Sequence, residues 1–209
     1  MTKIHKDFQL EGKDVRQVSY VCNYCGKAVV SSFGLAMHHF SSGVWSGQTN
    51  GMGVFICPNC GLPTFLGKED NNMMVQIPGA AFGNDVSNVP DDVAEIYDEA
   101  REAYSVGSYT GVILLCRTLL DHLAVSFGAK ENQSFQEYVD FLFEHNYITI
   151  NSKKWVDAIR KFGNKATHRL VINTRDDAEL IITFCEMLLK SNFEYPAILD
   201  EQQNGDTDN

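Results

Sequence analysis

The chain has 209 residues, of which 44% are hydrophobic and 21% charged, so a wholly disordered chain is excluded. No apolar run approaches the roughly 18 residues that a membrane-spanning helix needs, and residues 1–14 lack the apolar core of a signal peptide. We therefore expect a cytoplasmic protein with no membrane partner. The formal net charge of -10 argues against a nucleic-acid partner only if that charge is evenly spread.

The charge is in fact uneven along the chain. Residues 1–80 have a net charge of +1, residues 81–199 of -7 and residues 200–209 of -4. Within the second block, residues 153–175 hold seven lysines and arginines against Asp157 alone, a net charge of +6. The acidic total therefore hides a basic segment that an anionic partner could contact.

Residues 1–80 are rich in glycine, serine and asparagine, and they contain short apolar runs that are typical of strands. These runs are Gln17–Val21, Lys27–Ser32, Gly53–Ile56 and Thr64–Leu66. Residues 81–90 have the composition of a linker.

From Pro90 onward the pattern changes to helices. The predicted helices are Asp91–Ser105, Tyr109–Phe127, Phe135–His145, Ser152–His168 and Arg175–Phe193. Ser134 and Glu137 are spaced to form a capping box, and Thr174 is the predicted N-cap of the last helix, with Pro196 just beyond its end. Residues 200–209 contain no apolar side chain and are predicted to form a disordered acidic tail.

Four of the six cysteines occur in two C-x-x-C-G motifs, Cys22 to Gly26 and Cys57 to Gly61. Two intervening residues let both thiolates of a motif reach one ion from a tight turn, and the glycine can adopt the positive φ of such a turn. Two such turns on short hairpins predict a structural Zn2+ site with the ligands Cys22, Cys25, Cys57 and Cys60.

The alternatives for these cysteines are an iron centre or a redox pair. A catalytic zinc ion is disfavoured because four thiolates leave no open coordination position. His38 and His39 lie between the motifs and are interpreted as loop or surface residues. Cys116 and Cys185 lie in apolar helical stretches and are interpreted as core residues.

The fourth predicted helix has one apolar stripe, made of Trp155, Ala158, Ile159, Phe162, Ala166 and Leu170. If the helix persists, Arg160, Asn164 and His168 share the opposite face. Lys161, Lys165 and Arg169 form a stripe beside them. This face is either a solvated polar surface that ends at Gly163, or an anion-binding surface on which His168 transfers protons.

The second predicted helix is apolar around most of its circumference, so Arg117 stands out. Asp121 lies one turn later, at ion-pairing distance, and a partly buried ion pair is the favoured interpretation. The alternative is that the pair orients groups in a site, where Arg117 would contact nucleic acid.

Residues 97–192 resemble the HEPN-like helical family of unknown function found in bacterial and phage proteins, including restriction-associated ones. The landmarks are Tyr97-x-Glu99-Ala100, Gly107-x-Tyr109, Arg117-x-x-Leu120-Asp121 and Ile159-Arg160-x-x-Gly163-Asn164-x-x-x-His168. Members of that family often carry an N-terminal ribbon with paired cysteines. The resemblance implies an α+β chain: a small four-cysteine zinc ribbon in residues 1–80 and an all-α HEPN-like bundle in residues 91–199.

Related HEPN ribonucleases cleave RNA without a metal ion, at a site formed where two copies meet. The resemblance implies that Asn164 and His168 match their polar residue and histidine, whereas Gly163 stands at the arginine position and Arg160 lies one turn earlier. The resemblance therefore implies a homodimer that binds or cleaves RNA and acts in a prokaryotic or phage defence system. Its catalytic candidates are Arg160, Asn164 and His168. The nucleic-acid-binding candidates are Lys161, Lys165, Arg169 and Arg117.

Two other functions remain open. The chain could be a catalytically inactive dimeric adaptor that binds a protein partner, an interpretation that Gly163 and the overall acidity favour. It could also be a redox protein that uses its C-x-x-C pairs.

Overall fold

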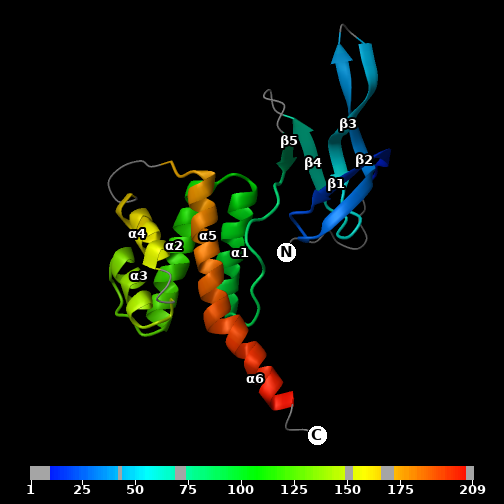
Figure 1. The fold of residues 1–209 in the computed structure, drawn as a ribbon. Helices are drawn as coiled ribbons and strands as arrows, with labels where there is room; N and C mark the ends of the chain where they lie inside the picture. Colours follow the sequence, from blue (N-terminus) through cyan, green and yellow to red (C-terminus); the bar gives the residue numbers. More distant parts are fainter. Residues whose placement is uncertain (1–9, 42–43, 69–73, 149–152, 166–171, 206–209) are drawn as a thin grey trace. The chain divides into compact units, whose positions relative to one another are not determined.

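The computed structural model confirms an α+β chain that divides into two units, Met1–Ala81 and Phe82–Asn209. The first unit holds a sheet and the second holds helices (Figure 1). The residues that the structure describes are 10–41, 44–68, 74–148, 153–165 and 172–205.

The first unit is a five-stranded antiparallel sheet in which each strand pairs with the next along the chain. The strands are β1 (Lys13–Val21), β2 (Ala28–Ser41), β3 (Val44–Ile56), β4 (Pro63–Lys68) and β5 (Met74–Ile77). All four predicted strands are present, but β5 was not predicted. The edge strands β1 and β5 are also joined, since Gln76 Nε2 donates a hydrogen bond to the Val21 carbonyl oxygen over 2.7 Å.

Strands β2 and β3 are much longer than the sequence predicts, and they extend past the other strands as a two-stranded arm (Figure 1). The pairing of β2 with β3 shifts register on either side of His38, so the apolar alternation is broken there. Gly47, Gly51 and Gly53 interrupt it further in β3. Because of these interruptions, the full length of β2 and β3 does not show the alternation of apolar and polar residues that predicts a strand.

The core of the first unit lies on one face of this sheet and continues into the cysteine motifs. Its buried members are Tyr20, Cys22, Phe55, Cys57 and Leu66. Because neighbouring residues of a strand point to opposite faces, the residues adjacent to Phe55 and Leu66 lie on the other face of the sheet.

The second unit is helical, and the predicted helix starts agree closely with those observed. The helices are α1 (Asp91–Ser105), α2 (Tyr109–Ser126), α3 (Phe135–Glu144), α4 (Lys153–Lys165), α5 (Arg175–Leu189) and α6 (Tyr195–Gly205). The predicted capping box of Ser134 and Glu137 is present, and Thr174 caps α5 with Asp177 in the same arrangement.

Helix α2 is the centre of the second unit, as its apolar circumference predicts, and it packs against α1, α3 and α5. Cys116 of α2 and Cys185 of α5 are fully buried, which confirms their interpretation as core residues. From α4, Val156, Ile159 and Phe162 enter the same core.

The last predicted helix does not end at Phe193. The predicted disordered tail is also wrong for the residues from 200 onward that the structure describes, because they are helical. Helix α5 continues through a π-helical turn, Lys190–Glu194, into α6, which includes residues 200–205. In this wider turn the Tyr195 amide donates to the Lys190 carbonyl oxygen. Pro196 has no amide hydrogen to donate, and the wide turn lets the helix pass it.

Residues 82–90, predicted as part of a linker, are packed onto the helical unit. Phe82, Val86 and Val89 lie against its hydrophobic core. We call residues 82–90 the strap. These side chains are spaced by four and three residues, which is a helical spacing, but the strap is not helical, so this pattern does not predict how they are buried.

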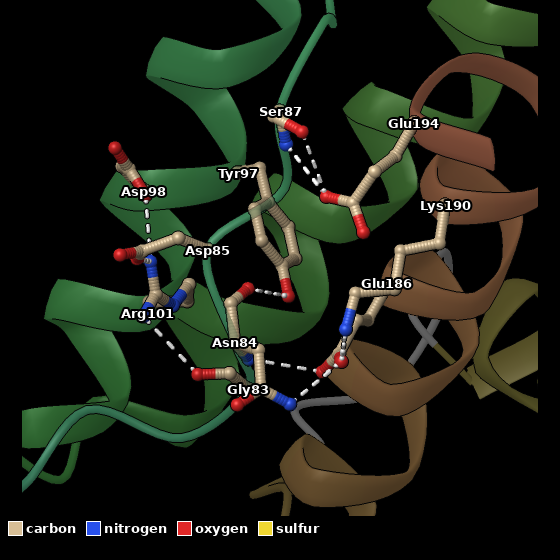
Figure 2. A network of polar contacts seen from close by, with 10 residues as sticks. All are labelled: Gly83, Asn84, Asp85, Ser87, Tyr97, Asp98, Arg101, Glu186, Lys190 and Glu194. Carbon is tan, nitrogen blue, oxygen red and sulfur yellow. Dashed lines mark hydrogen bonds and ion pairs between the residues drawn. The ribbon is translucent and has the colours of Figure 1, made fainter. Parts of the chain in front are cut away.

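Polar contacts fasten the strap at several points (Figure 2). The Asn84 amide and its Nδ2 donate to the two oxygens of Glu186 over 3.0 and 2.8 Å. The Ser87 amide donates to Glu194 over 2.8 Å, and Arg101 donates to the Gly83 carbonyl oxygen over 3.1 Å. The strap therefore belongs to the helical unit.

Candidate functional site

The two cysteine motifs form matching turns at the same end of neighbouring hairpins. The first turn joins β1 to β2 and the second joins β3 to β4. The Gly26 amide donates to the Cys22 carbonyl oxygen over 2.8 Å, and the Gly61 amide donates to Cys57 over 2.9 Å. Both glycines have positive φ, 66° and 75°, as the C-x-x-C-G pattern predicts.

The hairpins bring all four predicted ligands together, with their sulfur atoms within 4.8 Å of one another. The Sγ atoms of Cys22 and Cys60 are 3.7 Å apart, and those of Cys25 and Cys57 are 3.8 Å apart. With zinc–sulfur bonds of about 2.3 Å, a tetrahedral site has sulfur–sulfur edges of about 3.8 Å. The four sulfurs therefore have the spacing that a tetrahedral four-sulfur metal site requires.

The surroundings of the cluster differ between its buried and its outer members. Burial raises the pKa of Cys22 to about 12. Burial also acts to raise the pKa of Cys25, but hydrogen bonds from the Lys27 amide and from Asn59 outweigh it and lower that pKa to about 7. Such N–H donors stabilise thiolates, the form in which cysteine binds a metal.

A side-chain contact joins the two turns. Lys27 Nζ donates to Asn59 Oδ1 over 3.2 Å. Neither residue was predicted to take part in the site, although each lies directly beside a motif cysteine or its glycine in the sequence. The arrangement can hold one ion with four protein ligands and leaves no position for a substrate.

His38 lies on β2 and is exposed. It is therefore a surface residue, as one interpretation predicted, and not a loop residue. His39 also lies on β2, and its side chain is outside the described part of the structure.

The basic segment is described only in part. Lys154 and Lys161 of α4 are exposed, and the exposed Asp157 lies between them in the sequence. Arg160, Asn164 and Lys165 lie on α4 by their backbone, and nothing is described of their side chains. His168 and Arg169 lie outside the described residues.

The ends of the segment that carries His168 are nonetheless placed. Helix α4 is described to Lys165, and Asn173 is held by Thr110 of α2, whose Oγ1 accepts hydrogen bonds from its amide and Nδ2. Asn173 therefore lies beside the start of α2.

Arg117 and Asp121 do not form the predicted ion pair among the described residues. The guanidinium carbon of Arg117 lies 4.8 Å from the ring centroid of Phe135, in a cation–π contact between α2 and α3. Arg117 Nε and Asp121 Oδ1 are both buried without a hydrogen-bond partner in the described structure. Burial raises the pKa of Asp121 to about 6, against the opposing effect of the Arg117 charge.

A polar cluster that the sequence analysis missed joins α1 to the start of α5. Arg175 Nε donates to the Tyr104 hydroxyl and to Glu179, each over 2.8 Å. The Tyr104 hydroxyl also donates to Glu179, and burial is the main cause that raises the Tyr104 pKa to about 12. The four-residue spacing of Arg175 and Glu179 was the available signal for their ion pair.

Residues 98–205 match the family described as Domain of unknown function (DUF4145). No curated protein matches the chain, and no solved structure does. Within the described residues, every helix is too short or too polar to cross a membrane.

Proposed function

The chain belongs to the DUF4145 family, whose function is unknown, and we propose that it is a zinc-binding, RNA-binding protein of the cytoplasm that acts as a homodimer. In this proposal one Zn2+ ion holds the first unit together, and the basic segment of the second unit contacts RNA. The HEPN-like resemblance adds a role in prokaryotic or phage defence.

The spacing of the four sulfurs is the observation that supports zinc. Thiolates favour zinc, copper and iron–sulfur clusters over hard cations, and a tetrahedral set of four sulfurs is typical of structural zinc. The ion would be bound by Cys22, Cys25, Cys57 and Cys60, and its binding energy would contribute directly to folding.

The exposure of Lys154 and Lys161 on α4 is the observation that supports RNA binding. In the proposal these lysines act with Arg160, Lys165 and Arg169, and the resulting charge attracts phosphates despite the acidic total. We leave Arg117 out of this proposal, because its guanidinium lies over the Phe135 ring and its Nε is buried.

Cleavage is a separate step. RNA cleavage without a metal ion needs an imidazole with a pKa near neutrality to activate the ribose 2′-OH. It also needs a cation beside the phosphate. In the proposal His168 supplies the imidazole, Arg160 the cation, and Asn164 orients the phosphate.

Incubation of single-stranded RNA with the metal-loaded wild-type protein and with His168→Ala tests the enzyme. Loss of cleavage with retained RNA binding in the variant is the expected result. Equal cleavage by both proteins would remove His168 from the mechanism. RNA binding without cleavage by either protein would support binding alone.

The second candidate function is a catalytically inactive adaptor that binds a protein. The net charge of -10 favours it, because an acidic chain repels the phosphates of nucleic acid. This candidate predicts no salt-sensitive RNA binding at any protein concentration.

A further inference from the structure

The sheet of the first unit has an apolar row on the face opposite its core, exposed at its two ends and half-buried in its middle. Directly paired residues of neighbouring strands point to the same face, and Leu35, Val54, Phe65 and Ile77 are paired in succession across β2, β3, β4 and β5. Leu35 is 58% exposed and Ile77 is 56% exposed. With strands about 4.8 Å apart, the row spans roughly 14 Å.

A further apolar side chain widens the row along β2. Phe33 lies two residues before Leu35 and is 38% exposed. An antiparallel sheet with one buried face normally presents polar side chains on the other. This sheet presents apolar side chains on both faces, and we call the exposed one the outer face.

All of the named residues of the outer face except Ile77 belong to a stretch without formal charge. Between Lys27 and Lys68 the sequence contains no Asp, Glu, Lys or Arg, although 21% of the whole chain is charged. Charged residues occur beside it on the edge strand, where Asp14 is paired with Phe33. An uncharged apolar centre with charges at its border is the composition of a protein–protein interface.

We propose that the outer face is the contact surface between two copies of this chain. In a two-fold dimer the same patch meets itself, so a charge close to the axis faces the same charge of the other copy and is repelled. For a chain of net charge -10, residues 28–67 offer a patch that can meet its own copy without that repulsion. Two such sheets would pack face to face, with Val54 and Phe65 of both copies in the centre and Leu35 and Ile77 at the ends of the row.

This inference names the surface of the homodimer in the proposed function, and it stands or falls separately from RNA binding. The test is sedimentation velocity of the full metal-loaded chain over a wide concentration range, for the wild type, Leu35→Lys and Leu199→Lys. Leu199 of α6 is 57% exposed, so it is a control of matched exposure in the other unit.

We expect a concentration-dependent wild-type dimer that Leu35→Lys weakens at least tenfold and Leu199→Lys leaves unchanged. Ile77→Lys, at the other end of the row, should weaken the dimer as well. Zinc content equal to that of the wild type would show that the lysine variants keep the fold of the first unit.

A wild-type chain that stays monomeric would overturn the inference, as would a dimer that only Leu199→Lys disrupts. RNA binding is measured on the same samples. A Leu35→Lys monomer that still binds RNA supports the inference and leaves the RNA proposal intact. A wild-type dimer that binds no RNA would count against that proposal without affecting the dimer surface.

Discussion

Cys57 and Cys185 are both buried, but only the sulfur of Cys57 lies in the four-sulfur cluster. We predict that Cys57→Ser lowers the metal content from one zinc per chain to near zero, since a serine hydroxyl is a poor zinc ligand. Cys185→Ser is the matched control and should keep the metal. Elemental analysis of the purified proteins gives both values, and equal zinc in the two variants would contradict the assignment.

The protonation of Asp121 should make the stability of the protein depend on pH. Its folded-state pKa is about 6, above the ordinary value of 3.8, because burial disfavours the carboxylate. Between these values the folded chain binds more protons than the unfolded chain, so this group lowers stability as pH rises from about 4 to 6.

Asp121→Asn stays uncharged, so we expect it to be more stable than the wild type at neutral pH. Urea unfolding of the helical unit from pH 4 to pH 7, followed by circular dichroism, measures the difference between the two proteins. The gap should open as pH rises. A gap that is constant with pH would show that Asp121 does not titrate in this window.

At the scale of elements, the strap is held by two acids from different turns. Glu186 accepts from the Asn84 amide, and Glu194 accepts from the Ser87 amide. We predict that Glu186→Ala costs roughly 2 kcal/mol of local stability, in the range of hydrogen bonds to charged groups. Hydrogen exchange should then accelerate at the Asn84 amide more than at the Ser87 amide.

Glu194→Ala is the reciprocal control and should reverse the order of the two amides. If both variants released both amides equally, the strap would open as one unit and the two contacts would not act locally.

The same elements show what local sequence can and cannot predict. Helix α1 was predicted with both its ends, and the capping boxes at Ser134 and Thr174 mark helix starts because they act within four residues. The strap and α6 were missed because their structure depends on contacts that are distant in sequence, such as Asn84 with Glu186, or on a local π-helical turn before Pro196.

The candidate site likewise has a part that local sequence predicts and a part that it does not. The zinc ligands follow from motif spacing, and the structure brings all four together. The Arg117–Asp121 ion pair was inferred from a helical spacing of four, but Phe135 of another helix competes for the guanidinium. A spacing rule describes one helix and contains no information on the ring that packs against it.

At the scale of the whole molecule, the two units should respond differently to metal removal. The core of the first unit includes Cys22 and Cys57, whereas the core of the second is built from its own helices. We predict that a strong chelator unfolds the sheet and leaves the helical unit folded. Proton–nitrogen NMR would show loss of dispersed signals from residues 10–77 alone, and concerted loss of both units' signals would contradict this separation.

Binding of RNA by the basic segment is the central claim, and its salt dependence tests it most directly. Single-stranded RNA binding is measured at several salt concentrations for the wild type and for the triple variant Lys161→Ala, Lys165→Ala and Arg169→Ala. Each lost phosphate contact reduces the steepness of log K against log salt by about 0.7, so the slope should flatten by about 2 in the variant. A salt-independent wild type, or a variant with an unchanged slope, would contradict the account.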